Sequence, residues 1–466
     1  MIVLRRELLS GLAATAAWGA SGAASALAAP EFWDVLVVGS GAAGLCAGVA
    51  ALEAGARRVL LLEKRPWAGG HAIVSSGSLN ALSDAFGDSA ERFFRDTYEA
   101  GGRVADEKLV RTMVEESAQL LVWLRGMGVA FEARPYEAYN GLYPRAWRTG
   151  DPYPAYRYIS ALMQRYRRLG GQVLWNARAT ALTAESGRIV GVELFGRTLR
   201  AGATVLATGG WGADVALRRR WRPALGEAYG TTFSPLRIEE DPATGDGIRM
   251  AEAAGARLRE MDAVMAIPYW GGRVLDYPGA EIFLDDQGRR FTDETSSWQE
   301  IFDDLAATGS ASFWVVTDER SKKGDTFVGK VAAGVVKSAP DIKSLARAMG
   351  VHEAVLEQTL RAYNRAAQGA PDEQFGRTRF AQPLSTPPYY FGRERFDVHY
   401  CCGGIAIDEH ARVLGDAGPI AGLYAAGETT GGVHGRFRLG GSGLTDAMVF
   451  GRRAGRQAAL SQGRFA

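Results

Sequence analysis

Cysteine is scarce in this sequence, and its positions exclude several kinds of site. The 466-residue chain has 3 cysteines, Cys46, Cys401 and Cys402, and none of them lies in a CxxC or CxxCH motif. A disulfide framework, a zinc finger, an iron–sulfur cluster and an attached c-type haem are therefore not expected. We interpret Cys401 and Cys402 as structural residues, and we predict no metal site.

Charge of one sign is not in excess either. The chain has 54 Lys and Arg against 52 Asp and Glu, a formal net charge of +2, with the two signs interspersed. This balance lacks the basic patch of a nucleic-acid-binding protein. Beyond the N-terminus no apolar run is long enough to cross a bilayer, so stable membrane insertion is not expected. The hydrophobic fraction of 47% indicates a soluble globular protein, and the length indicates two or more domains.

Residues 1–28 have the pattern of an export signal. Arg5 and Arg6 precede an apolar Gly/Ala/Leu run, and the residues at 26–28 read ALA, a small-x-small cleavage pattern. Paired arginines are typical of the twin-arginine route, which exports proteins already folded. We expect cleavage near Ala28 and a periplasmic mature protein. The alternative is a weakly hydrophobic, disordered N-terminus.

Glycine, in contrast, is abundant, and one glycine-rich stretch has the dinucleotide-binding pattern. The chain has 59 Gly, nearly twice the usual frequency of ~7%. The sequence GSGAAG at 39–44 follows a predicted buried strand at 34–38 and opens an Ala-rich helix to about Gly55. A second apolar strand at 59–62 ends in Glu63, about 20 residues after the last glycine of the motif.

Each residue of this motif has a physical role in such a site. Gly39 permits a tight turn, Gly41 lets the backbone approach a pyrophosphate, and Gly44 allows close packing of the helix on the strand. The helix N-terminus offers unpaired N–H groups to phosphates, and Glu63 can accept hydrogen bonds from ribose hydroxyls. The alternative is a glycine-rich turn in an α/β domain without a ligand.

Motifs near the C-terminus are more specific. Residues 422–435 read GLYAAGETTGGVHG and residues 438–443 read RLGGSG, while ATGG stands at 207–210 and TGDG at 244–247. Together these motifs resemble the flavoprotein subunit family of fumarate reductases and succinate dehydrogenases, most closely its soluble flavocytochrome-type members and their relatives acting on other enoates. The resemblance covers nearly all of the chain after residue 30, and it implies that the cofactor is FAD.

The resemblance also implies the fold class and the domains. We expect an α/β protein in which a Rossmann-like FAD-binding domain of the glutathione-reductase type carries an inserted α+β capping domain. The FAD-binding domain would comprise residues 30–262 and 399–466, and the capping domain residues 263–398. A strand is predicted at 313–316 and a helix at 345–367. The substrate would bind at the domain interface, and movement of the capping domain would gate its entry.

Several positions match cofactor-binding residues of the family. Glu428 matches the acid that holds the ribityl chain, and the glycine-rich turn before the last helix, which begins at about Leu444, places N–H groups near the flavin N1 and C2 carbonyl. Such groups stabilise the anionic reduced flavin. His434 beside this turn is expected to position the backbone rather than to transfer protons. The expected cofactor-binding residues are Gly39, Gly41, Ala43, Gly44, Glu63, Lys64, Gly70, His71, Gly77, Thr208, Gly209, Gly427, Glu428, Ser442 and Leu444.

Up to three of the four substrate-binding groups of the family are replaced in this sequence. Ile267 stands where the family has the histidine of a His-Pro-Thr stretch, and Trp298 stands in place of the proton-donating arginine. The second histidine falls at Tyr400, although its neighbour His399 remains a candidate for substrate contact. Only the late arginine, Arg438, clearly matches. The resemblance therefore does not imply fumarate or succinate as the substrate.

Aromatic side chains replace the missing groups. Tyr269, Trp298 and Tyr400 would face the substrate, and aromatic walls with one or two arginines suit a ring-bearing or larger unsaturated acid or ketone. Tyr400 is the predicted acid/base, because a phenol held near an arginine can have its anion stabilised. Arg438, with Arg436 as a second candidate, would polarise the carbonyl or carboxylate that activates the double bond.

His71 raises a separate question about the cofactor. It follows a glycine pair at 69–70 and lies nine residues before Asn80. Soluble fumarate reductases usually have asparagine here and hold FAD non-covalently. In the membrane-bound succinate dehydrogenase branch, a histidine with this spacing carries the flavin through its 8α-methyl carbon. Covalent attachment through His71 and simple hydrogen bonding near the cofactor are both left open.

The function predicted from these features is that of an exported FAD-dependent oxidoreductase acting on CH–CH bonds. It would reduce or form a C=C bond conjugated to a carbonyl or carboxylate by hydride transfer at flavin N5. One alternative is a ketosteroid-type or alicyclic-ketone dehydrogenase, and another is a flavin-binding redox partner that has lost catalysis. A separate cytochrome or quinone-linked electron carrier is expected, because the chain has no haem motif of its own.

Overall fold

The computed structural model describes residues 32–461, apart from residues 139, 152, 234–239, 276 and 325. The predicted export signal at 1–28 lies outside the described residues. The chain divides into two compact units. Among the described residues, the first unit comprises 32–228, 240–264 and 400–461, and the second comprises 229–233 and 265–399. No helix in the described part of the chain is long and apolar enough to cross a membrane.

A parallel sheet forms the centre of the first unit. Its strands run in the order β17-β8-β1-β2-β5, and every neighbouring pair in this run is parallel. β1 and β2 are nearly continuous apolar segments, as expected for strands covered on both faces. The strands are β1 (Phe32–Val38), β2 (Val59–Leu62), β5 (Gln172–Leu174), β8 (Arg197–Leu206) and β17 (Gly418–Ala425).

An antiparallel extension continues this sheet. β6 (Ala181–Glu185), β7 (Arg188–Leu194) and the first half of β8 form a meander, and β16 (Arg412–Gly415) pairs with β17. β8 extends from Arg197 to Leu206, and only its second half is continuously buried. Its exposed first half pairs with β7 and its buried second half with β1 and β17.

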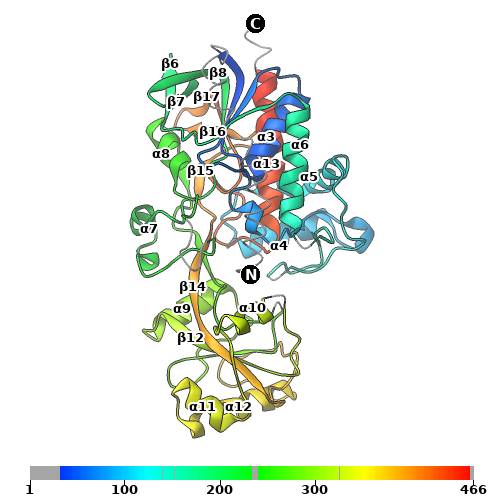
Figure 1. The fold of residues 1–466 in the computed structure, drawn as a ribbon, viewed down its shortest axis with the longest axis vertical. Helices are drawn as coiled ribbons and strands as arrows, with labels where there is room; N and C mark the ends of the chain where they lie inside the picture. The colour runs from blue at the N-terminus through cyan, green and yellow to red at the C-terminus, as the bar shows by residue number, and fades with distance from the viewer. Residues whose placement is uncertain are drawn as a thin grey trace. The chain divides into compact units, whose positions relative to one another are not determined.

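Two glycine-lined helices pack closely beside the parallel sheet. α3 (Ala42–Glu53) and α13 (Ser442–Leu460) lie side by side in Figure 1, with α6 (Pro154–Arg168) along α3. A Cβ on Gly451 would lie 2.4 Å from the Ala43 carbonyl oxygen, and one on Gly455 would lie 1.9 Å from that of Ala47. Only glycine allows this approach. Because 451 meets 43 and 455 meets 47, the two helices run parallel.

Further elements complete the first unit. The segment from Ser89 to Gly128 contains α4 (Ala90–Ala100) and α5 (Glu107–Arg125), capped by the side chains of Ser89 and Asp106. A small sheet runs in the order β18-β15-β9. The remaining elements are β3 (Leu79–Asn80), β4 (Ala146–Trp147), α7 (Val215–Trp221), α8 (Asp246–Ala253), β9 (Leu258–Arg259), β15 (Gly404–Ala406), β18 (Thr430–Gly431) and short 3-10 turns at Ala72–Val74, Asp84–Phe86 and Pro223–Leu225.

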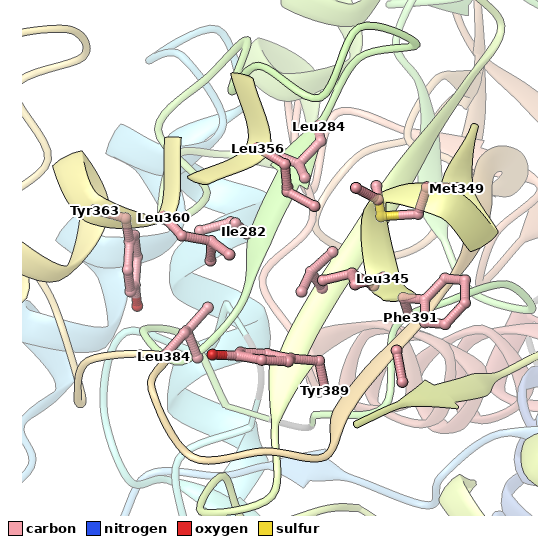
Figure 2. Packing of buried hydrophobic residues seen from close by; sticks show 13 residues of the cluster. Ile282, Leu284, Leu345, Met349, Leu356, Leu360, Tyr363, Leu384, Tyr389 and Phe391 are labelled. Carbon is pink, nitrogen blue, oxygen red and sulfur yellow. The ribbon is translucent and has the colours of Figure 1, made fainter. Parts of the chain in front are cut away.

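The second unit is built on its own sheet, ordered β10-β14-β12-β11, with β13 also paired to β14. Side chains of α11 and α12 pack on this sheet, and Figure 2 shows Leu345, Met349 and Leu360 pointing toward Ile282 and Phe391. The elements are β10 (Val264–Pro268), β11 (Ile282–Leu284), α9 (Trp298–Ala307), β12 (Ser312–Asp318), α10 (Phe327–Ala332), β13 (Lys337–Ala339), α11 (Ile342–Met349), α12 (Glu353–Ala367) and β14 (Tyr389–Cys401).

Two details of the second unit differ from the sequence prediction. The single helix predicted at 345–367 is wrong, because Gly350 ends α11 in the left-handed conformation with φ 73°. Residues 229–233 were assigned to the first unit, but they lie with the second. The Tyr229 and Phe302 rings contact each other at a tilt, with centroids 5.7 Å apart, and the Thr232 N–H donates to the Val398 carbonyl.

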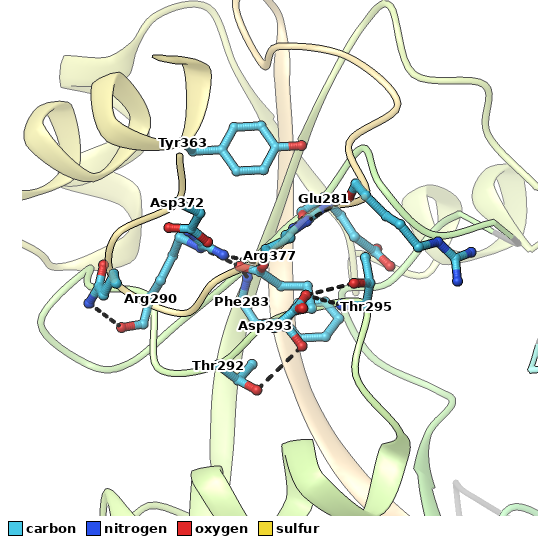
Figure 3. A network of polar contacts seen from close by, with 12 residues as sticks. Glu281, Phe283, Arg290, Thr292, Asp293, Thr295, Tyr363, Asp372 and Arg377 are labelled. Carbon is cyan, nitrogen blue, oxygen red and sulfur yellow. Dashed lines mark hydrogen bonds and ion pairs between the residues drawn. The ribbon is translucent and has the colours of Figure 1, made fainter. Parts of the chain in front are cut away.

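A buried ionic network stabilises the second unit. Arg290 pairs with Asp372 (Figure 3). Glu294 pairs with Arg290 as well and contacts Arg377. Glu281 pairs with Arg273 nearby in the sequence, at 2.8 Å. These side chains are buried, so removing one partner would leave an unpaired charge in the interior.

Candidate active site

The carboxyl ends of four parallel strands meet at one edge of the first unit's sheet. β1 leads to Gly39, β2 to Glu63, β8 to Ala207 and β17 to Gly427. Ligands of such open sheets bind at this edge. α3 begins here with Gly41 at its N-cap, without a capping side chain and without an acid in its first turn. Its first N–H groups are therefore available to an anion.

The three motif glycines occupy positions that suit a dinucleotide. Gly39 has φ 105°, and a Cβ there would lie 2.3 Å from the Ala207 carbonyl oxygen. A Cβ on Gly44 would lie 1.9 Å from the Gly39 carbonyl oxygen, so helix and strand are in close contact. At Gly41 the nearest atom to such a Cβ is 3.9 Å away. The space in front of Gly41 therefore leaves room for a pyrophosphate.

The acid and lysine after β2 are held in place by hydrogen bonds. Glu63 Oε2 accepts from the Ser40 N–H at 3.0 Å and from its hydroxyl at 2.6 Å, and Glu63 Oε1 accepts from the Arg65 N–H. Lys64 Nζ donates to Thr244 Oγ1 at 2.7 Å and pairs with Asp246 at 3.0 Å. Glu63 thus presents an oriented carboxylate at the predicted ribose position, and Lys64 ties down the loop with the TGDG motif.

The N-terminus of α13 lies on the same side of the sheet edge as the N-terminus of α3, beyond it along the helix axis. α13 starts after Gly441, which has φ 87°, and it has no capping side chain. Because Gly451 lies beside Ala43 near the start of α3, α13 begins about nine residues, or ~13 Å, before that point. One N-terminus suits a pyrophosphate and the other the negative charge of a reduced flavin at N1 and C2.

A buried amide marks the start of α13. Asn80 Nδ2 donates to the Gly440 carbonyl at 2.8 Å and to Ser442 Oγ at 3.0 Å. Its Oδ1 is buried without a hydrogen-bond partner among the described residues. A buried acceptor without a partner is costly in a protein interior, which fits a donor group of a bound cofactor.

Other predicted cofactor-binding residues have mixed surroundings. Gly427 has φ 76° and lies against Ala43, and Gly209 has φ 73° with open space around it. Thr208 Oγ1 lies 3.1 Å from Thr429 Oγ1. A Cβ on Gly77 would meet Pro154 of α6 at 2.4 Å, so this glycine is needed for packing. Gly70 adopts φ 50° near Gly41, and Ser442 is buried while Leu444 is half-buried.

His71 lies between two carboxylates. Its Nε2 is 2.6 Å from Asp241 Oδ1, and its Nδ1 is 3.7 Å from Glu428 Oε2. Burial alone would lower the pKa of His71, but the two carboxylates outweigh it and raise the pKa above the usual 6.5. Burial raises the pKa of Glu428, and His71 opposes this shift. The same acid accepts from the Cys401 N–H at 3.0 Å.

The raised pKa of His71 predicts a pH-dependent stability. Protonation stabilises the folded state, fully below the unfolded pKa, and this contribution is lost as the pH rises through the folded pKa. We expect the free energy of unfolding of the flavin-free protein to exceed that of His71→Gln most clearly below about pH 6.5. Urea unfolding at several pH values measures this difference. His410→Gln is the matched control, and an equal pH dependence in both variants would contradict the prediction.

Tyr400 lies in a buried polar cluster of the first unit. Its hydroxyl donates to Asp446 Oδ2 at 3.2 Å, and its ring meets the His434 ring edge-on at 5.7 Å. His434 Nε2 lies 3.3 Å from the same Asp446 oxygen. The guanidinium of Arg438 lies 5.0 Å from the centroid of the Tyr400 ring. Arg438 also donates to the Leu439 carbonyl at 3.0 Å.

This arrangement corrects the argument that Arg438 stabilises a Tyr400 anion. Burial, together with the carboxylates of Asp446 and Glu428, raises the pKa of Tyr400 well above 10, and Arg438 only partly offsets them. The guanidinium faces the ring while the hydroxyl faces a carboxylate. The phenol is therefore neutral, which suits a proton donor and not a base.

Two further candidates lie elsewhere. The Arg436 side chain is 61% exposed and pairs with Asp262 at 3.0 Å. His399 Nδ1 lies 2.9 Å from Thr232 Oγ1 in the second unit. Because successive side chains of a strand point to opposite faces, His399 and Tyr400 of β14 do not share a face. Arg436 is thus engaged by Asp262, and His399 by Thr232.

In the second unit, Trp298 is placed differently from the prediction of a substrate-facing wall. The residue is 4% exposed and packs near Phe283 and Phe396. The Arg273 guanidinium lies 4.7 Å from the centroid of its ring. Trp298 thus belongs to an aromatic core, and its ring is not a surface wall of that unit. Tyr269 remains 37% exposed.

Sequence reasoning missed Asp241 and Asp446, which hold His71 and Tyr400. Asp446 lies at the fifth position of α13, where a buried acid in an otherwise apolar stretch is a detectable signal. Asp241 has no comparable signal, because it lies in a loop and meets His71 across 170 positions of sequence. Within the described ranges, no group of three or more His, Cys, Asp or Glu residues is arranged to hold a metal ion.

Most of the chain is similar to known flavoproteins. The chain matches the FAD binding domain family over residues 34–444. It is 32% identical to the NADH:fumarate oxidoreductase of Klebsiella pneumoniae, over 93% of this chain and 48% of that protein. It is 31% identical to the urocanate reductase of Eggerthella lenta, over 91% of this chain and 74% of that protein.

A solved structure is similar as well. The open conformation of a flavocytochrome c3 fumarate reductase aligns with a TM-score of 0.78 at 31% identity, covering 93% of this chain and 79% of that one. The match extends over both units. The chain nevertheless spans only about half the length of the Klebsiella relative.

Proposed function

The chain belongs to the FAD-binding flavoprotein family of fumarate reductases and succinate dehydrogenases, and on this premise we propose that it is an FAD-dependent oxidoreductase acting on CH–CH bonds. It reduces, or forms, a C=C bond conjugated to a carbonyl or carboxylate. The observation that carries the proposal is the pairing of a neutral Tyr400 with Arg438 in the unit whose sheet edge suits FAD. Bound FAD supplies or accepts the hydride at N5.

The residues of this chain supply the other parts of the reaction. α3 and α13 would present their N-termini to the pyrophosphate and the flavin, and Glu63 and Glu428 would hold the sugar and ribityl hydroxyls. Arg438 binds the carbonyl or carboxylate and draws electron density from the double bond. Tyr400 donates the proton to the carbon next to that group, in the direction of reduction.

The substrate that we propose carries one acidic or ketone group and a ring or other apolar part. Ile267 has no charge to hold a second carboxylate, and Trp298 is part of an aromatic core, so neither side chain favours a small dianion. Arg438 then remains as the main cation near Tyr400. The relative that reduces urocanate acts on an unsaturated acid, which is in line with this class.

The test of the function is a substrate panel with an artificial low-potential electron donor under anaerobic conditions. Ring-bearing enoates should be reduced faster than fumarate. Identification of the saturated product shows that the C=C bond is the group reduced. Reduction of the flavin by saturated ketones alone would instead favour a ketosteroid-type or alicyclic-ketone dehydrogenase. A flavin that reacts with no member of either set would indicate a redox partner without catalysis.

The proposal also covers the two domains, the export of the protein and its electron carrier. The first unit is a Rossmann-like FAD-binding domain of the glutathione-reductase type, and the second is an α+β capping domain inserted in it, which gates substrate entry. The protein is exported through a twin-arginine signal at 1–28 and acts in the periplasm. A separate cytochrome or quinone-linked carrier exchanges electrons with it.

His71 carries a prediction about the cofactor link. Because its Nε2 lies 2.6 Å from Asp241, the His71 ring is held in a fixed orientation, as a covalent link to the 8α-methyl carbon of bound flavin would require. We expect flavin to remain on the chain after acid denaturation of the wild type and to be released from His71→Ala. The fluorescence of the denatured protein in a gel measures this. Complete release from the wild type would show that His71 only hydrogen-bonds near the cofactor.

A further inference from the structure

The polar cluster around Tyr400 contains more titratable groups than a single proton donor needs. One oxygen, Asp446 Oδ2, contacts both the Tyr400 hydroxyl at 3.2 Å and His434 Nε2 at 3.3 Å. His434 is 2% exposed and Asp446 is buried as well. Two groups that share one carboxylate oxygen can exchange a proton through it without any movement of the backbone.

The other ring nitrogen of His434 points to a continuation of this cluster. His434 Nδ1 is buried without a hydrogen-bond partner among the residues that the structure describes. Buried ring nitrogens of this kind are usually satisfied by an ordered water. Glu260 is the next acid, since its carboxylate interacts electrostatically with His434.

Glu260 connects the cluster to the surface. Glu260 Oε2 accepts from the Gly432 N–H at 2.9 Å, two residues before His434, and Glu260 Oε1 lies 3.3 Å from Arg259. Arg259 in turn pairs with Asp106 at 3.1 Å, whose side chain is more than one-third exposed. The series therefore runs from the buried Tyr400 to solvent entirely within the first unit.

We propose that Tyr400, Asp446 and His434 form a proton relay, with Glu260 at its solvent end, that returns a proton to Tyr400 after each turnover. This inference rests on the proposed function. When Tyr400 gives its hydroxyl proton to the substrate carbon, the phenolate takes the Nε2 proton of the His434 ring through Asp446 Oδ2. The same ring takes up a proton at Nδ1 from water at Glu260, and rotation of the ring then turns the protonated nitrogen back toward Asp446. No electrons move in this step, and solvent supplies the net proton.

The charged and titratable groups that face this relay are few. Arg438 lies over the Tyr400 ring, Glu428 and the Cys402 thiol act on Tyr400 electrostatically, and Arg259 pairs with Glu260. Asp446 and His434 act through Tyr400 and are positioning residues. The earlier interpretation of His434 as a backbone-positioning residue alone is replaced by this proposal.

The test compares Asp446→Asn and His434→Gln with two controls in the FAD-loaded protein. Glu116→Gln removes a carboxylate of α5 that pairs with Arg453 of α13, the helix that carries Asp446, and His410→Gln removes a histidine outside the site. We expect both relay variants to bind FAD and substrate with KM nearly unchanged and to lose about tenfold or more in kcat. Their kcat should fall further as the pH rises, roughly tenfold per pH unit, because hydronium ions become the proton source. Small protonated buffers should restore part of the rate.

A second measurement does not depend on turnover. The chain has 5 His, so the ring N–H signals of histidine-labelled holoenzyme can be assigned by NMR through their loss in variants. The Nε2–H of His434 should exchange slowly and resonate downfield, and it should move upfield in Asp446→Asn but not in Glu116→Gln. If this signal is unchanged in Asp446→Asn, or if active wild type and relay variants share one pH profile, the relay is wrong. If the wild type reduces no substrate while the NMR coupling is present, the proposed function fails instead.

Discussion

Tyr400→Phe lowers the rate of turnover by ~10²–10⁴-fold, the usual contribution of a general acid, while KM and FAD content stay close to wild type. The reason is that the substitution removes only the hydroxyl, which donates to Asp446 at 3.2 Å, and leaves the ring against His434 and under Arg438. Steady-state kinetics with the best member of the substrate panel, together with the solvent isotope effect, measure the change.

The matched control for this variant is Tyr424→Phe. Tyr424 is also buried in the first unit, and its hydroxyl makes only a 3.4 Å contact with the Gln457 carbonyl. The control should keep its activity. A Tyr400→Phe enzyme with the rate and isotope effect of wild type would assign the proton donor to another group.

Arg438→Ala should abolish most of the turnover, by ~10²–10³-fold, without loss of FAD. The guanidinium lies over the Tyr400 ring and donates to the carbonyl of the neighbouring Leu439. Removing it takes away the charge that stabilises the developing negative charge on the substrate. The flavin absorbance per chain and kcat/KM are the two quantities to compare.

Arg453→Ala serves as the control for the loss of an arginine near the last helix. Arg453 lies on α13 and pairs with Glu116 at 3.2 Å, outside the cluster around Tyr400. Both variants should retain flavin. Loss of flavin from Arg438→Ala alone would place this residue in the cofactor site and not in the substrate site.

Local sequence patterns predicted part of the fold well. The strand β1, the helix α3 and the strand β2 are confirmed, because a buried apolar run, a glycine motif and an Ala-rich stretch follow one another in a short segment. The helix predicted at 345–367 was wrong, since one glycine in the left-handed conformation, Gly350, is enough to divide it. Residues 229–233 were predicted in the wrong unit, because their partners, such as Val398, are distant in sequence.

The site was predicted less completely than the fold. Motif positions locate Tyr400 and Arg438, but the direction of a side chain depends on tertiary packing. Trp298 shows this, since its ring is surrounded by Phe283, Phe396 and Arg273 of the second unit. The neutral state of Tyr400 could not be predicted either, because it follows from burial and from Asp446, which is distant in sequence.

The most direct test of the account mixes anaerobically reduced holoenzyme with one equivalent of a ring-bearing α,β-unsaturated acid and follows the flavin absorbance by stopped flow. We predict rapid reoxidation of the flavin, with formation of one equivalent of the saturated acid, and a much slower reaction in Arg438→Ala. Flavin that stays reduced with every enoate and enone tested, in wild-type protein with a full complement of FAD, would contradict the proposed function.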